Sequence, residues 1–175
     1  FCAHNFSFHG YRRKKIAGFV DELQTLVLRH DAKHFYLADQ YVPAHLLAEL
    51  SEEILRRGLD LRFHVMARPT AEYTPQRLAL AAAAGCTWIS WGVESGSQRL
   101  LNMVRKGTRR PTVEQVLDDS RAVGIRNLAM MIFGLPTSTE ADLEETFHLF
   151  DCIWPDVDAV TASSFVNQRS EEHTS

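Results

Sequence analysis

Apolar side chains recur every three or four residues along two stretches in the first third of the chain. The first stripe contains Ile16, Phe19, Val20, Leu23 and Val27, and the second contains Leu46, Leu47, Leu50, Ile54 and Leu55. This spacing places the apolar side chains on one face of a helix. Each stripe is followed by a short apolar segment, at residues 34–39 and 61–68, that is typical of a strand.

The alternation of helix and strand continues to the end of the chain. Gly85 and Gly124 follow helix-like segments, as glycine often does at helix ends, and the strand-like sequences "CTWISWGVE" and "IRNLAMMIFG" begin directly after them. An amphipathic helix over residues 142–152 and a strand over residues 156–166 complete the pattern. The chain therefore contains five predicted strands, each separated from the next by a predicted helix.

Five strands that alternate with helices indicate an α/β fold with a parallel sheet and right-handed crossovers. Periodicity leaves two architectures open, an open doubly wound sheet and part of a barrel. In both, functional sites form just beyond the carboxyl ends of the strands. We therefore expect the polar residues at these ends to converge: Asp39, Arg68, residues 94–97, residues 134–139, and Ser163 with Ser164.

Threonines supply the predicted helix starts. Thr74 precedes Pro75 and Thr112 opens the sequence "TVEQ", and both patterns are typical of helix N-termini. In "GLPTSTEAD", Thr137 and Glu140 have the spacing of a capping box. The same turn, at the end of a strand, is also suited to lining a small-molecule pocket, and both interpretations stay open.

Glu94 is the sharpest candidate for a functional residue. It ends an apolar strand in "TWISWGVESGS", and the small residues after it leave room for a ligand. A carboxylate accepts hydrogen bonds from paired hydroxyls, which is the geometry of ribose recognition in nucleotide sites. The structural alternative is an ion pair with Arg68 at the end of the neighbouring strand.

Composition narrows the class of protein. The chain has 175 residues, of which 45% are hydrophobic and 23% charged, so it can form one globular domain or most of one. Its formal charge of -3 gives no general attraction to nucleic acid. The most apolar stretch, residues 78–86, is shorter than a membrane span. The three widely spaced cysteines, Cys2, Cys86 and Cys152, favour a reducing compartment, and we expect a cytoplasmic protein.

Both ends of the chain have the character of a fragment. The chain begins with Phe1 and Cys2 instead of methionine, and it ends in the polar heptapeptide "RSEEHTS". That heptapeptide resembles a translated sequencing-library adapter. We therefore interpret residues 1–168 as the domain and residues 169–175 as a non-native tail.

The sequence "WISWGVESGSQRLLNMVRKGTRR", with "AAAAGC" before it and "AVGIRNLAMMIFGLP" after it, resembles the catalytic core of radical S-adenosylmethionine (SAM) enzymes. It is most similar to the subgroup that often carries an upstream cobalamin-binding domain. The resemblance runs from Phe1 to about Val166. It implies a partial (β/α)6 TIM-like barrel of parallel strands, from which this chain lacks the first strand.

The resemblance also implies a metal ligand. In this family a loop after the first strand carries three cysteines spaced C-x-x-x-C-x-x-C, and an aromatic residue commonly precedes the last one, as Phe1 precedes Cys2. Cys2 would then be the third ligand of a [4Fe-4S] cluster, and the first two would lie upstream of Phe1. Such a cluster leaves one iron open for SAM and cleaves it reductively into a 5'-deoxyadenosyl radical that acts on a substrate.

The remaining site residues follow from the same resemblance. Glu94 would contact the ribose of SAM, and Asp39 and Arg68 would face the cofactor or the substrate. The other implied cofactor-binding positions are Ser95, Gly96, Ser97, Gly134, Leu135 and Ser163. The implied partners are a small-molecule substrate and an electron donor such as flavodoxin or ferredoxin, without nucleic acid or membrane.

The chain departs from the family at two places. The turn after the fifth strand of the family usually reads GLPGE, whereas this chain has Thr137 and Ser138 in the last two positions. Paired aspartates often follow the second strand of the family, but here Gln40 follows Asp39. Both changes touch the edge of the implied cofactor site.

Two other functions fit the pattern of strands. One is a cluster-free barrel enzyme of aldolase or isomerase type, which is disfavoured because no lysine stands at a strand end and no glycine-rich phosphate loop follows the late strands. The other is a non-catalytic small-molecule-binding relative in which Cys2 is an incidental thiol. Sequence upstream of Phe1 separates these functions from radical SAM chemistry.

Because the chain contains one of the three implied cluster ligands, we expect the isolated 175-residue chain to assemble no stable [4Fe-4S] cluster and to be inactive. Anaerobic reconstitution with iron and sulfide, followed by visible absorption and electron paramagnetic resonance, measures this. A complete, reducible cluster on the isolated chain would contradict the expectation.

Overall fold

A computed structural model describes residues 13–166 of the chain. Helices and strands alternate along this part, and a short helix, α5, adds to the predicted pattern. The elements are α2 (Ile16–His30), β1 (His34–Tyr36), α3 (Ala44–Arg56), β2 (Arg62–Ala67), α4 (Pro75–Ala83), β3 (Cys86–Glu94), α5 (Gln98–Met103), α6 (Arg110–Ala122), β4 (Arg126–Phe133), α7 (Glu140–Ile153), the 3-10 helix η1 (Trp154–Asp156) and β5 (Ala159–Ser164).

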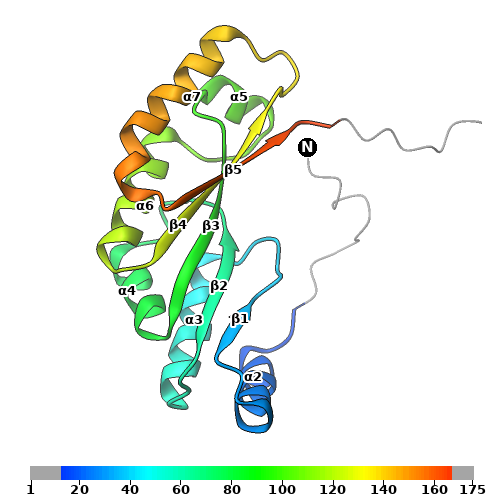
Figure 1. Cartoon of the computed structure of the whole chain (residues 1–175), viewed down its shortest axis with the longest axis vertical. Helices are drawn as coiled ribbons and strands as arrows, with labels where there is room; N and C mark the ends of the chain where they lie inside the picture. Colours follow the sequence, from blue (N-terminus) through cyan, green and yellow to red (C-terminus); the bar gives the residue numbers. More distant parts are fainter. Residues whose placement is uncertain (1–12, 167–175) are drawn as a thin grey trace, which may run out of the picture.

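The five strands form one parallel sheet in the order β1-β2-β3-β4-β5. Each strand is therefore added beside the previous one in the same direction, and right-handed crossovers then place all the connecting helices on one face. Figure 1 shows the sheet curling with its helices on the outer side. A doubly wound sheet reverses its strand order, and this sheet does not. The fold is a partial (β/α) barrel, as the sequence resemblance implied.

Several helix ends follow the predicted signals. Thr74 caps α4 by accepting a hydrogen bond from the backbone N–H of Arg77 at 3.4 Å. Gly85 has φ 99°, and a Cβ there would lie 2.1 Å from the carbonyl oxygen of Leu61, so only glycine fits between α4 and β3.

Two predicted helix starts are wrong. Thr112 lies inside α6, which begins at Arg110. The capping box of α7 is formed by Thr139 and Asp142, two residues later than the predicted pair. The reason is that Thr137 takes a left-handed conformation, with φ 63°, and so belongs to the preceding turn.

The hydrophobic core lies between the sheet and the helices. Alternate residues of β2, β3 and β4 point toward the helices and are buried. They are Phe63, Val65, Ala67, Ile89, Trp91, Val93, Ala129 and Met131. The intervening residues face the inner side of the curve, where His64 hydrogen-bonds Ser90 at 2.7 Å. The inner side is thus more polar than the core.

A buried asparagine joins the sheet to the helices in this core. The Asn127 side chain accepts a hydrogen bond from Trp91 Nε1 at 2.8 Å, and its amide donates to the carbonyl oxygens of Leu117 at 2.9 Å and Asp156 at 2.7 Å. Asn127 is fully buried, so these groups have no access to water. The asparagine fixes β4 relative to β3, α6 and the turn before β5.

No helix within residues 13–166 is long and apolar enough to cross a lipid bilayer.

Asn127→Leu should lower the free energy of unfolding of the chain by about 2–3 kcal/mol, because it leaves the buried N–H of Trp91 without an acceptor and removes the two hydrogen bonds to the carbonyl oxygens of Leu117 and Asp156. Urea unfolding followed by circular dichroism measures the change. Asn102→Leu is the matched control, since Asn102 is exposed and bonds the side chain of Gln98, and it should change the value by less than about 0.5 kcal/mol. Equal unfolding midpoints for the two variants would contradict this role of Asn127.

Candidate functional site

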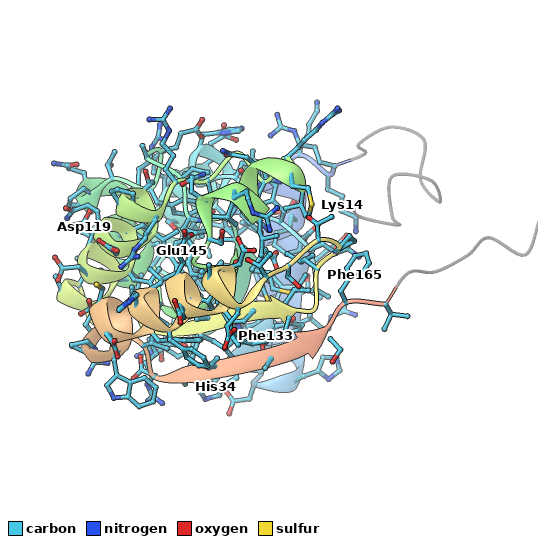
Figure 2. All side chains as sticks on the ribbon, turned by 90° about the horizontal axis from the view of Figure 1, so that it is seen from above. Lys14, His34, Asp119, Phe133, Glu145 and Phe165 are labelled. Carbon is cyan, nitrogen blue, oxygen red and sulfur yellow. The ribbon has the colours of Figure 1, made fainter. Side chains whose placement is uncertain are left out.

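A cleft of about 1000 Å³ opens at the carboxyl ends of the central strands. Its floor includes Arg68 after β2, Gly92 and Glu94 of β3, and Met130 of β4. Phe165, which follows β5, also lines the cleft and stands at the end of that strand in Figure 2. Ala67 of β2 and Met103 at the end of α5 also line the cleft, and the other lining residues come from loops: Gln40, Tyr41, Val104, Arg105, Lys106 and Pro136. The cleft therefore lies where parallel α/β folds place their sites.

Glu94 reaches the cleft through an irregularity in β3. The pairing of β3 with β4 shifts between Gly92 and Glu94, so β3 carries one extra residue there. Glu94 also adopts a left-handed backbone, with φ 71°, which costs a residue other than glycine about 1–3 kcal/mol. Bulges re-aim side chains and are common beside active sites. The bulge and the left-handed backbone thus bring Glu94 to the wall of the cleft.

The carboxylate of Glu94 forms an ion pair with the ammonium of Lys106. Both side chains are only 11% exposed, so the two charges compensate each other away from water. The pair lies over Gly92, where a Cβ would come within 2.8 Å of Lys106 Nζ and 3.0 Å of Glu94 Oε1. Glycine at position 92 therefore makes the room that the pair occupies.

Sequence reasoning offered Arg68 as the structural partner of Glu94, and the structure places Lys106 there instead. Lys106 follows α5 between two residues with left-handed backbones, Arg105 with φ 52° and Gly107 with φ 70°. These conformations turn the chain back toward the sheet. The sequence does show a basic segment, "RKG", after a short apolar helix. Periodicity alone, however, does not indicate that this segment lies beside the end of β3.

Arg68 remains a cation at the rim of the cleft. Its guanidinium lies 5.4 Å from the centre of the Tyr41 ring, within cation–π range. Burial raises the pKa of Tyr41, and the charge of Arg68 opposes part of that rise. Arg68 thus contributes a positive charge to the lining of the cleft.

The loop after Glu94 faces α7. Ser95 Oγ lies 3.3 Å from Thr146 Oγ1, and the Gly96 N–H donates to the same oxygen at 3.1 Å. Ser97 Oγ donates to Asp142 Oδ1 at 2.6 Å. Ser95, Gly96 and Ser97 are all buried, and none of the three lines the cleft. They hold the end of β3 against the neighbouring helix.

Asp142 is ionised in this arrangement. The Arg99 guanidinium, and then the hydroxyls of Ser97 and Thr139, hold the pKa of Asp142 well below its usual range. A carboxyl whose folded-state pKa is depressed stabilises the fold above its unfolded pKa, and that contribution is lost as the pH falls below about 4. At neutral pH the carboxylate therefore keeps all its partners.

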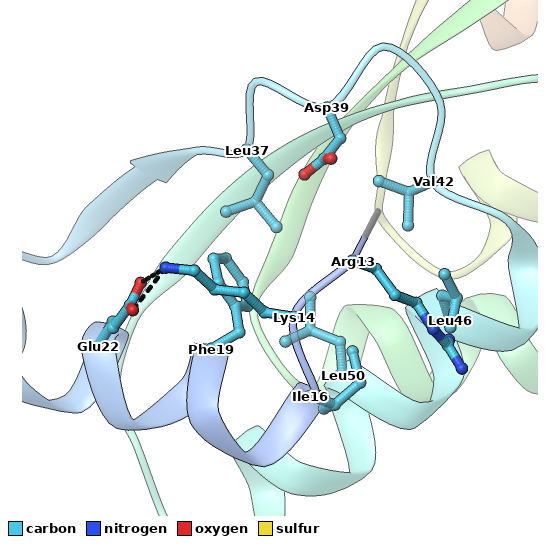
Figure 3. Close-up of a pocket in the computed structure, with 10 residues that line it drawn as sticks. All are labelled: Arg13, Lys14, Ile16, Phe19, Glu22, Leu37, Asp39, Val42, Leu46 and Leu50. Carbon is cyan, nitrogen blue, oxygen red and sulfur yellow. Dashed lines mark hydrogen bonds and ion pairs between the residues drawn. The ribbon is translucent and has the colours of Figure 1, made fainter. Parts of the chain in front are cut away.

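Asp39 lies in a different cavity from Glu94. This second cavity, of about 290 Å³, lies between the start of α2, the loop after β1 and α3. Figure 3 shows Asp39 beside Leu37 at its rim, with the ion pair of Lys14 and Glu22 at one side. The neighbours of Asp39 in sequence, Gln40 and Tyr41, are the residues that reach the main cleft.

The other predicted positions lie near the cleft without lining it. Gly134 is exposed with φ 74°, Leu135 is buried, and the next residue, Pro136, is the one that lines the cleft. Ser163 is exposed on β5, paired with Ile132. Cys2 lies outside the described residues. Within residues 13–166, no three histidine, cysteine or acidic side chains come together as a metal site.

Comparison with known proteins identifies the family. The model of the radical SAM superfamily matches residues 1–150. The chain belongs to this superfamily. The proteins of this superfamily are enzymes.

Relatives of this radical SAM chain include cyclases and methyltransferases. The anaerobic magnesium-protoporphyrin IX monomethyl ester cyclase of Rubrivivax gelatinosus is 33% identical over 158 residues, which cover 85% of this chain and 27% of the relative. An uncharacterized methyltransferase of Pyrococcus horikoshii is 24% identical over 149 residues, which cover 83% of this chain and 32% of the relative. The chain thus spans about a third or less of these relatives.

Solved structures show the same fold. The radical SAM methyltransferase TsrM from Kitasatospora setae, with cobalamin and a [4Fe-4S] cluster bound, has a TM-score of 0.75 at 23% identity, covering 87% of this chain and 29% of that chain. The cobalamin-dependent radical SAM enzyme OxsB, with aqua-cobalamin and SAM bound, has a TM-score of 0.63 at 26% identity, covering 77% of this chain and 21% of that chain. These cofactors match those that the sequence resemblance implied.

The family pattern explains one strained residue of this radical SAM chain. Thr137 stands where the GLPGE turn of the family has its second glycine, and its left-handed φ of 63° is a conformation that glycine adopts without cost. The threonine is held in place by Arg99, which donates to the Thr137 carbonyl oxygen at 2.7 Å. The turn thus keeps a glycine-like backbone without glycine.

Gly96→Ala should lower the free energy of unfolding by about 1–3 kcal/mol. Its Cβ would lie 2.5 Å from both the Glu145 carbonyl oxygen and the Thr146 Cα, which are backbone atoms of α7 and cannot turn away. Gly18→Ala is the control, because a Cβ there meets no neighbouring segment within 4 Å, and alanine at this position in the first turn of α2 should stabilise the chain by about 0.5 kcal/mol. Thermal unfolding of both variants should show a lower midpoint for Gly96→Ala and a higher one for Gly18→Ala. A higher midpoint for Gly96→Ala would contradict the close approach of α7 to Gly96.

Proposed function

We propose that the full-length protein is a radical SAM enzyme that holds SAM in the cleft at the carboxyl ends of β2, β3 and β4. The observation that supports this most directly is the placement of Glu94. A strained, bulged end of β3 presents its carboxylate to the cleft, paired with a cation and surrounded by small residues. This is the position at which the family resemblance puts recognition of the ribose.

The residues that line the cleft fit the groups of SAM. Glu94 offers two oxygens to the paired ribose hydroxyls, and Lys106 and Arg68 offer positive charge to the carboxylate of the methionine part. Met130, Pro136 and Phe165 supply apolar surface for the adenine. A cleft of about 1000 Å³ also leaves space for a substrate beside the cofactor.

In the absence of a ligand, the charges of Glu94 and Lys106 compensate each other by forming an ion pair. Each charge is nearly buried, and either one alone would carry a large desolvation cost. Ribose hydroxyls that bond to Glu94 and a carboxylate that bonds to Lys106 would replace the pair by two new charge-assisted contacts. SAM presents both groups at once, whereas a ligand with only one of them would leave a charge uncompensated.

Cys2, which lies outside the described residues, is the ligand that this chain would contribute to a [4Fe-4S] cluster. When bound, the [4Fe-4S] cluster supplies the electron that cleaves SAM reductively and generates the 5'-deoxyadenosyl radical. The residues of this chain have a different task. Glu94 and Lys106 orient the cofactor, and the apolar side chains of Met130, Pro136 and Phe165 exclude water from it.

The neighbouring structures support a cobalamin-binding domain in the full-length protein. OxsB and TsrM are both described with cobalamin bound, and both match this chain along most of its length. The curated relatives carry out different reactions, cyclisation and methyl transfer, on a shared core. The substrate of this protein is therefore determined by residues outside the shared core.

Glu94→Ala in the cluster-loaded, full-length protein should raise the dissociation constant for SAM about tenfold or more, because it removes a charged acceptor from two hydroxyls. Isothermal titration calorimetry under anaerobic conditions measures the constant. Glu49→Ala, which removes an exposed carboxylate from α3, is the control and should leave it unchanged. An unchanged constant for Glu94→Ala would exclude the ribose role.

A further inference from the structure

Asp142 has more hydrogen-bonding partners than the capping of one helix requires. Its side chain is 5% exposed. Oδ1 accepts from Ser97 Oγ at 2.6 Å and from Arg99 Nε at 3.1 Å. Oδ2 accepts from the backbone N–H of Thr139 at 2.8 Å and from its hydroxyl at 2.6 Å, and also pairs with the Arg99 guanidinium. Every acceptor direction of the carboxylate is thus in use.

These partners belong to two segments of the chain, the start of α5 and the cap of α7. Ser97 ends the loop after β3, Arg99 lies in α5, and Thr139 is the cap of α7. Arg99 extends the network to the turn after β4, where it donates to the carbonyl oxygen of Thr137. A single carboxylate therefore ties the loop that follows Glu94 to the turn that precedes α7.

Thr146 makes a second connection one turn further along α7. Its hydroxyl accepts from the Gly96 N–H at 3.1 Å, lies 3.3 Å from Ser95 Oγ, and donates to the Asp142 carbonyl oxygen at 2.9 Å. These hydrogen bonds, and the close approach of the α7 backbone to Gly96, together restrict the conformation of the loop. The strained backbone of Glu94 directly precedes this loop.

We propose that Asp142 is a positioning residue for the cofactor site, which aims the Glu94 carboxylate into the cleft by clamping the Ser95–Ser97 loop against α7. The proposal rests on the proposed function, because it assigns a support to the group that binds the ribose. Asp142 does not line the cleft. Its effect on SAM passes through the loop and through Glu94.

A double-mutant cycle in the cluster-loaded, full-length protein tests this route. In Asp142→Asn the side chain keeps nearly the same shape but loses the negative charge that Arg99 binds. Its amide N–H group also faces donors from Ser97, Arg99 or Thr139. Alone, it should raise the dissociation constant for SAM about tenfold. Combined with Glu94→Ala, it should cause little further weakening, because the group that it positions is gone. Calorimetric titration of the four proteins with SAM gives the coupling.

Two further variants make the test specific. Glu144→Gln removes an exposed charge from the same helix and should leave the dissociation constant unchanged. Thr146→Val keeps the shape of the side chain and removes the hydroxyl that bonds Gly96. Thr146→Val should also raise the dissociation constant for SAM, and it should cause little further weakening when combined with Glu94→Ala. If Asp142→Asn fails to fold, Thr146→Val takes its place in the double-mutant cycle. Thermal unfolding of each variant separates loss of affinity from loss of structure.

The outcomes distinguish the two proposals. A wild-type protein that binds SAM, with coupled effects at Asp142 and Glu94, supports the clamp. Effects of Asp142→Asn that persist in full on the Glu94→Ala background, or an unchanged dissociation constant, overturn the clamp and leave the proposed function standing. A cluster-loaded wild-type protein that binds no SAM overturns both.

Discussion

The contact between the end of β3 and the first turns of α7 determines the geometry of the cleft. The backbone of α7 comes so close to Gly96 that a methyl group there would lie 2.5 Å from it. Packing at this distance leaves the loop no freedom to move as a hinge. The left-handed Glu94 and the bulge in β3 stand directly before this loop.

Electrostatic compensation is the second constraint on the site. The structure buries two carboxylates, Glu94 and Asp142, and supplies each with its own cation. The two differ in what satisfies them. Asp142 has five donors from the surrounding protein and does not line the cleft, whereas Glu94 and its partner Lys106 both line it. Only the Glu94 pair therefore stands where a molecule in the cleft would meet it.

Much of this could be predicted from the sequence because the fold is repetitive. Helical stripes, closing glycines and apolar strands each depend on local spacing, so five strands and the ends of α4 and α6 were visible without a structure. Glu94 was also visible, as a carboxylate that ends an apolar strand. The cap of α7 was misplaced because Thr137 and Thr139 are both suitable caps by type, and only the left-handed backbone at Thr137 selects Thr139.

Sequence patterns alone predicted the alternation of helices and strands, the edge of the sheet at which a site would form, and the family of the chain. The tertiary structure decided between a doubly wound sheet and a barrel, since strand order depends on contacts between distant segments. It also decided that Lys106 pairs with Glu94, and that Ser97 turns to Asp142 and away from the cleft. These partners are separated by 12 and 45 residues, and no local periodicity carries information about side chains that meet only after the chain has folded.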